Sequence, residues 1–268
     1  MIRLIPLVVL NAALGCAQVP ALPAPLAPGH RILFVGNSLT YTNGLPATVE
    51  AIARSAGDTL QVTMAAGPDL ALIDHLNGAT NAVQLLHDQA WDYVVLQQGP
   101  TSAPGICRDS LILWTRMFAE KIRAAHAQPA LFMTWPAVAS GDVWNNVRES
   151  FRLAAAAVDG VFLPAGEAWH IALADHPGLP LYGPDGFHPS PTGSFLAALE
   201  IYERLTGRDA RTLSPQAFAA GVPFPMSADT VGFLQRAAHQ ANTTYGAASS
   251  IRPASTRATV PGGTGGRC

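Results

Sequence analysis

The sequence predicts an α/β domain: a three-layer sandwich in which a parallel sheet of about five strands is covered by helices on both faces. Short apolar segments alternate along the chain with longer segments whose apolar residues have helical spacing, and this alternation is typical of parallel sheets. The chain has 268 residues, 49% of them hydrophobic, which suffices for one such domain with a sizeable core.

The first predicted strand ends directly before a serine. Residues 32–35 form a continuous apolar run, as in a strand buried on both faces, and Gly36 ends it. Ser38 follows, and residues 45–56 have the apolar spacing of a helix. This order places the Ser38 hydroxyl at the carboxyl edge of the sheet, where ligands bind in open α/β folds. A helix cap or a turn serine is the alternative interpretation.

The remaining elements follow in alternation. Each further strand is short, apolar and followed by turn residues, and these strands are expected at residues 59–64, 93–97, 130–134 and 161–163. Helices are expected within residues 70–89 and at residues 110–125, 143–157, 165–174, 192–205 and 230–242.

Both ends of the chain are expected to lie outside the domain, which we place at residues 30–246. Residues 1–16 have the layout of a secretory signal peptide, with one basic residue, a short apolar core and then small residues. Its end resembles a bacterial lipobox, so Cys16 is either a lipid anchor or part of a plain secretory signal. The protein is therefore expected to be exported, as a periplasmic, membrane-anchored or secreted protein. Residues 17–29 form a Pro- and Ala-rich spacer, and residues 247–268 a disordered tail.

The distribution of charged, Cys and His residues argues against nucleic-acid binding and against a structural metal. The formal net charge is -2 and the basic residues are scattered, which argues against nucleic-acid binding. No Cys and His residues have zinc-site spacing, so no structural metal is expected. Cys107 and Cys268 remain beside Cys16, and an oxidising compartment allows them to pair. We expect two unpaired thiols, because Cys268 ends the tail.

A second chemical motif lies far downstream. Asp185 and His188 are three residues apart in a segment rich in Gly and Pro, which predicts a loop ahead of a helix. On a loop, the carboxylate can accept a hydrogen bond from one imidazole nitrogen and leave the other nitrogen free to act as a base. A chance pairing of Asp and His is the alternative.

These residues resemble two motifs of the SGNH (GDSL-type) serine hydrolases. Gly36-Asn-Ser-Leu-Thr resembles the first block of that family, with Asn where Asp is commoner, and Asp185-Gly-Phe-His resembles the last. The resemblance implies a flavodoxin-like sheet, Ser38 as nucleophile, His188 as general base and Asp185 as its orienting partner. It spans roughly residues 30–245 and implies no metal or organic cofactor.

The resemblance also implies an oxyanion hole, although one block departs from the usual pattern. The backbone N–H of Ser38 is one expected donor and that of Gly67 another, with an ordinary turn glycine as the alternative reading of Gly67. The usual Gly-x-Asn-Asp block is absent, and Leu96-Gln-Gln-Gly stands in its place, as in one subgroup of the superfamily. A Gln amide can replace the Asn amide, and Gln97 is favoured over Gln98 by strand parity.

The implied function is that of an exported serine esterase. We expect it to hydrolyse short acyl esters, such as O-acetyl groups on carbohydrate, through an acyl-Ser38 intermediate. A non-catalytic lipoprotein that binds carbohydrate or another ligand, and an acyltransferase, are the alternatives.

Five other residues are weaker candidates. His75 and His87 lie in a helical region and are expected at the surface or partly packed. Trp135, after the fourth strand, lines the cleft or packs in the core. Tyr41 and Asn43 shape the mouth of the cleft or have capping and turn roles.

Overall fold

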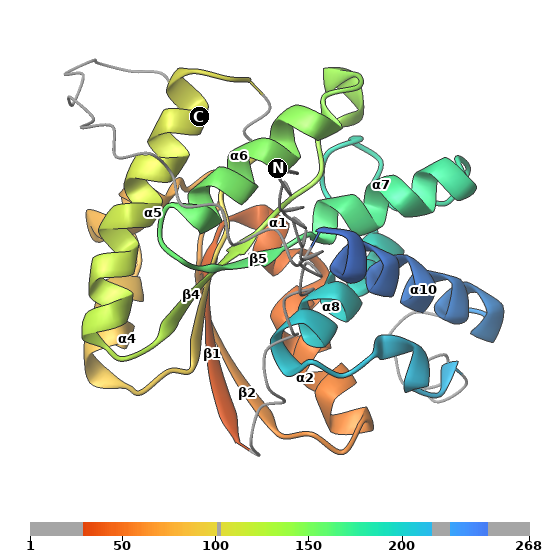
Figure 1. The fold of residues 1–268 in the computed structure, drawn as a ribbon, viewed down its shortest axis with the longest axis horizontal. Coiled ribbons are helices and arrows are strands. Elements are labelled where there is room, and N and C mark those ends of the chain that lie inside the picture. The colour runs from red at the N-terminus through yellow and green to blue at the C-terminus, as the bar shows by residue number, and fades with distance from the viewer. Residues whose placement is uncertain (1–28, 101–102, 216–225, 246–268) are drawn as a thin grey trace, which may run out of the picture.

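The computed structural model describes residues 29–100, 103–215 and 226–245 (Figure 1). The expected signal peptide, the spacer up to residue 28 and the tail lie outside these residues. Cys107 is disulfide-bonded, so the expectation that it is unpaired is wrong. Cys16 and Cys268, the other two cysteines of the chain, lie outside the described residues.

The five predicted strands form one parallel sheet, which confirms the fold class. The strands are β1 (His30–Gly36), β2 (Leu60–Ala66), β3 (Tyr93–Leu96), β4 (Gln128–Phe132) and β5 (Val161–Leu163). Their spatial order is β2-β1-β3-β4-β5, and every neighbouring pair is parallel. In this order the chain runs outward from β1 in both directions, so that a crevice is expected where β1 meets β3.

Helices cover both faces of the sheet. They are α1 (Ser38–Tyr41), α2 (Leu45–Ser55), α3 (Leu72–Leu76), α4 (Ala82–Asp88), α5 (Ile106–Ala124), α6 (Trp144–Ala156), α7 (Ala165–Asp175), α8 (Pro191–Thr206) and α10 (Ala228–Tyr245), with 3-10 turns η1 (Thr42–Gly44), η2 (Val138–Ser140) and η3 (Ala210–Thr212). In Figure 1, α2, α7, α8 and α10 lie on one side of the sheet, and α4, α5 and α6 lie on the other.

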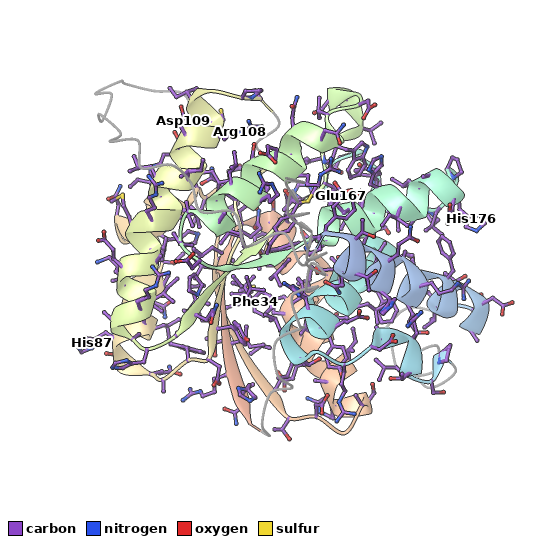
Figure 2. All side chains as sticks on the ribbon, viewed as in Figure 1. Phe34, His87, Arg108, Asp109, Glu167 and His176 are labelled. Carbon is purple, nitrogen blue, oxygen red and sulfur yellow. The ribbon has the colours of Figure 1, made fainter. Side chains whose placement is uncertain are left out.

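Side chains of each buried strand alternate between two hydrophobic cores. In β1, Ile32 and Phe34 pack with α2, α7, α8 and α10, whereas Leu33 and Val35 pack with α3, α4, α5 and α6. Figure 2 shows Phe34 in the interior, between the sheet and the first of these helical layers. The continuous apolar run in the sequence therefore reflects burial of the strand on both faces.

Several element boundaries differ from the prediction. Ser38 begins the short, single-turn helix α1, and residues 70–89 contain two helices rather than one. His87 lies at the outer edge of the molecule, as expected (Figure 2). Within the described residues, no helix combines the length and the apolar character that crossing a bilayer requires.

Candidate active site

Ser38 is held at the carboxyl end of β1 by a capped turn. Asn37 caps α1, since its side-chain Oδ1 accepts a hydrogen bond from the Leu39 N–H at 3.1 Å. Ser38 is the first residue of that helix, where a backbone N–H has no acceptor within the helix. Gly36 is required at the strand end, because a Cβ there would lie 2.3 Å from Thr40 Oγ1. The turn thus presents both the hydroxyl and the N–H of Ser38 at the edge of the sheet.

Asp185 and His188 form a hydrogen-bonded pair in the loop before α8. Asp185 Oδ2 lies 2.6 Å from His188 Nδ1, and Oδ1 accepts the backbone N–H groups of Phe187 and His188. These hydrogen bonds, above all the one with the His188 ring, lower the pKa of Asp185 to about 2. Because the carboxylate can only accept, the proton lies on His188 Nδ1, and Nε2 is left as an acceptor.

The fold brings this pair onto Ser38. His188 Nε2 lies 2.8 Å from Ser38 Oγ, although the two residues are 150 positions apart in the sequence. The three side chains predicted from the two motifs therefore form one continuous hydrogen-bonded chain from carboxylate to imidazole to hydroxyl. Such an arrangement can take a proton from the serine as its oxygen attacks an acyl carbon.

The two candidate Gln side chains lie at the end of β3, and both are 1% exposed. Gln97 Oε1 accepts hydrogen bonds from the Asn37 N–H at 2.9 Å and from Thr40 Oγ1 at 2.7 Å, so its amide lies against the turn that carries Ser38. Gln98 Oε1 instead accepts the Leu72 N–H at 3.1 Å. Among the described residues, neither Nε2 has a hydrogen-bond partner. Each side chain therefore has a buried Nε2 that could donate a hydrogen bond to a ligand. The Nε2 of Gln97 belongs to the amide that contacts the residues on either side of Ser38 in α1 and its cap.

The Gly67 N–H does not point freely into the site. It donates to the Gly36 carbonyl at 3.4 Å, and the side chain of Leu70 covers the position where a Gly67 Cβ would be. An oxyanion could recruit this N–H only by drawing it away from a long and weak hydrogen bond. The oxyanion roles of the Ser38 N–H, the Gly67 N–H and the two Gln amides therefore stay predictions.

His75 is wholly buried, so its expected place at the surface or partly packed is wrong. Its Nε2 donates to the Gly36 carbonyl at 3.1 Å, and its Nδ1 lies 2.7 Å from Thr80 Oγ1. Burial lowers the pKa of His75, which favours this neutral form. His75 therefore anchors the strand end that precedes Ser38. Helical spacing could not reveal this contact, because it depends on a backbone carbonyl 39 residues away.

Trp135 packs in the core and does not line an open cleft. Its ring stacks on Trp169 with the centroids 3.6 Å apart, and both residues are fully buried. The indole N–H donates to the Phe187 carbonyl at 3.0 Å, next to His188. Trp135 therefore connects the core to the loop that carries the His188 imidazole.

A second group of titratable residues lies away from the site. Glu203, Asp209 and His239 hold potential ligand atoms within 4.8 Å of one another. His239 Nδ1 already lies 2.9 Å from Glu203 Oε1, and Arg211 pairs with Asp209 at 2.6 Å. Since these side chains contact one another, the group is a polar network that joins α8, η3 and α10.

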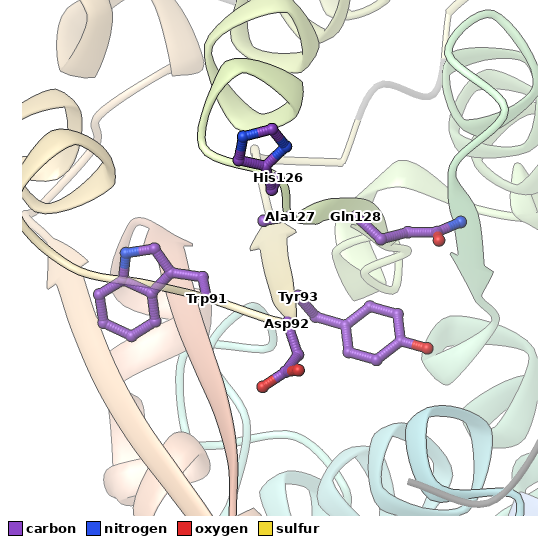
Figure 3. Close-up of a pocket in the computed structure, with 6 residues that line it drawn as sticks. All are labelled: Trp91, Asp92, Tyr93, His126, Ala127 and Gln128. Atoms are coloured by element: carbon purple, nitrogen blue, oxygen red, sulfur yellow. The ribbon is translucent and has the colours of Figure 1, made fainter.

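An open pocket of about 290 Å³ lies at the opposite edge of the sheet (Figure 3). Its lining residues precede or begin β3 and β4, and they are Trp91, Asp92, Tyr93, His126, Ala127 and Gln128. The pocket therefore belongs to the amino ends of the strands, whereas Ser38 lies at a carboxyl end. It takes no part in the candidate active site.

Comparison with known proteins gives matches only among solved structures. No family model matches the sequence, and no curated protein matches it. A predicted SGNH hydrolase from Slackia heliotrinireducens is 31% identical, with a TM-score of 0.55 over 66% of this chain and 99% of that one. A DUF4886 family protein from Bacteroides uniformis is 18% identical, with a TM-score of 0.66 over 81% and 95% of the two chains. A mutant acetylxylan esterase from Geobacillus stearothermophilus is 14% identical, with a TM-score of 0.54 over 69% and 98%. The last two matches show the shared fold alone.

Proposed function

The chain belongs to the SGNH hydrolases, and from this premise we propose that it is an exported serine esterase that forms an acyl-enzyme on Ser38. The observation that carries the proposal is the continuous chain of hydrogen bonds from Asp185 through His188 to Ser38, with distances of 2.6 and 2.8 Å. Neither a metal nor an organic cofactor is needed for this chemistry.

Each proposed step uses atoms that lie at the carboxyl edge of the sheet. Ser38 Oγ attacks the acyl carbon while His188 Nε2 takes the hydroxyl proton, and the imidazolium is stabilised by Asp185. The negative charge on the acyl oxygen is held by the Ser38 N–H and the Gln97 amide. His188 then returns the proton to the leaving alcohol. In the second half of the reaction, water attacks the acyl carbon while His188 Nε2 takes its proton. His188 then gives this proton to Ser38 Oγ as the bond to the acyl carbon breaks, which releases the acid and restores Ser38.

We assign short acyl groups, such as O-acetyl groups on carbohydrate, as the substrate class. Support comes from the SGNH relationship and from the fold shared with an acetylxylan esterase. Two exposed apolar residues also lie on segments that adjoin the triad: Tyr41 follows Ser38 on α1, and Val138 donates its backbone N–H to Gly186, in the loop that carries Asp185 and His188. A screen of acyl chain length and of acetylated saccharides tests this assignment, and product analysis separates hydrolysis from acyl transfer to a sugar.

A fluorophosphonate probe tests the proposed nucleophile directly. We expect the folded protein to be labelled on the peptide that contains Ser38, as located by mass spectrometry, and to lose its hydrolysis of acetyl esters in proportion. Heat-denatured protein is the control and should not be labelled, because the activation of Ser38 depends on His188. Folded protein that is not labelled, hydrolyses no ester and still binds a saccharide saturably would favour a non-catalytic binding protein instead.

The oxyanion donor can be identified with a matched pair of variants, Gln97→Glu and Gln98→Glu. Both keep an Oε1 that can accept the hydrogen bonds present in the structure, and both remove the Nε2 donor. We expect Gln97→Glu to lower kcat about a hundredfold to a thousandfold, the usual effect of losing one oxyanion donor, and Gln98→Glu to change it little. Steady-state kinetics on an acetyl ester provides the measurement. The opposite ranking would assign the donor to Gln98.

A further inference from the structure

The loop before α8, which carries Asp185 and His188 and is called the catalytic loop here, accepts hydrogen bonds at four successive backbone carbonyl groups. The carbonyls of residues 186–189 accept, in order, from the Val138 N–H at 2.9 Å, the Trp135 indole N–H at 3.0 Å, the Gly183 N–H at 2.7 Å and the Asn43 side-chain amide at 2.9 Å. The first two donors lie in the segment after β4, and the third lies in the loop itself. The fourth donor alone comes from the segment that carries Ser38.

Asn43 therefore joins the two halves of the catalytic site. It lies in η1, five residues after Ser38, and its Nδ2 donates both to the Pro189 carbonyl and, at 3.0 Å, to Ser194 Oγ. Pro189 directly follows His188. One side chain thus spans 146 positions of sequence and binds the segment of the nucleophile to the residue beside the base.

The backbone of Asn43 has an uncommon conformation. Its φ of 57° and ψ of 16° lie in the left-handed region, which Asn and Gly tolerate better than other residues. An asparagine that served only this turn could be exchanged for glycine without loss. The hydrogen bond to Pro189 adds a function that glycine cannot supply, so the two roles can be separated by experiment.

We propose that Asn43 is a positioning residue, which sets the distance between Ser38 Oγ and His188 Nε2; this proposal rests on the esterase function proposed above. The imidazole needs such support because it stands on an exposed loop, with 38% of its side chain accessible to solvent. Misplacement of a reacting group by about 1 Å can cost about a hundredfold in rate. Asn43 does not touch the substrate or the reacting atoms and acts through the loop that holds His188.

Two variants test the proposal. Asn43→Gly keeps access to the left-handed backbone and loses the amide, whereas Asn43→Asp keeps the size and places a carboxylate without donors against the Pro189 carbonyl. We expect both to lower kcat about tenfold to a hundredfold, with KM changed no more than about twofold. The rate of fluorophosphonate labelling at Ser38 should fall in parallel, since it depends on the same proton transfer.

Ser194→Ala is the matched control, because it removes the other acceptor of Asn43 and leaves the bond to Pro189 intact. It should keep kcat and the labelling rate near those of the wild type, with any loss limited to melting temperature. If the wild type is active, two results would overturn the positioning role alone. One is an Asn43→Gly variant with wild-type kcat, and the other is a Ser194→Ala variant whose kcat falls as far as that of Asn43→Gly. A folded wild type that neither hydrolyses esters nor reacts with the probe overturns the esterase function, and the positioning role with it.

Discussion

Replacing Ser38 with alanine is expected to lower kcat for a short acyl ester about a millionfold, the size of loss seen when a triad nucleophile is removed. Ser38 Oγ is the atom that bonds to the acyl carbon in the proposed mechanism, and it lies 2.8 Å from its base, His188 Nε2. Without it, neither the acyl-enzyme nor the fluorophosphonate adduct can form. Hydrolysis of an acetyl ester gives the primary measurement, and probe labelling gives a second.

His188→Ala should cost nearly as much as Ser38→Ala, and the double variant should be no worse than either, because the two residues act as one unit. Ser140→Ala, a change of the same type at an exposed position in η2, should keep wild-type activity. Melting temperatures close to that of the wild type would separate lost chemistry from lost folding. Near-unchanged hydrolysis by either catalytic variant would contradict the mechanism.

The sheet could be predicted from the sequence because its strands carry their signal locally. Residues 32–35 are apolar without interruption, and in the structure they alternate between two separate cores. Val161–Leu163 is found with the predicted bounds, since β5 is likewise an apolar run that is buried along its length. Burial of a strand on both faces is thus legible in a few consecutive residues.

Short helices left a weaker signal. The four residues of α1 are too few for a helical period, and the helix starts at Ser38 because Asn37 caps it. The stretch at residues 70–89 is broken into two helices, with Gly78 between them at a φ of 90°. Periodicity predicted helical content there, whereas the break depended on the conformation of a single glycine.

In the candidate site, too, some residues could be predicted from local sequence and others could not. Ser38, Asp185 and His188 could be singled out from two compact motifs, and the fold brings them within hydrogen-bonding distance. The groups that hold them leave no local pattern. The indole of Trp135 reaches a carbonyl 52 residues away, and such side-chain contacts with distant backbone follow only from the packed structure.

The second large effect is expected from Asp185→Asn, which should lower kcat about a thousandfold to ten-thousandfold at neutral pH. The carboxylate accepts from His188 Nδ1 at 2.6 Å and so keeps the ring proton on that nitrogen. An asparagine amide that faces Nδ1 donates instead, which favours the tautomer with the proton on Nε2. In that tautomer His188 cannot accept the proton of Ser38, although all three side chains remain in place.

Asp69→Asn is the control for Asp185→Asn. It makes the same change of charge in the turn after β2, where a φ of 55° suits asparagine, and it should leave activity unchanged.

Stability provides an independent readout of Asp185→Asn. Because the pKa of Asp185 is lowered to about 2 in the folded protein, its ionised form favours folding above the ordinary pKa of Asp, and this contribution is lost as the pH falls through about 2. The contribution is small, since half of the side chain is exposed. Asp185→Asn should therefore keep nearly the wild-type melting temperature at neutral pH while its activity is lost, and equal losses of stability and activity would assign Asp185 a structural role instead.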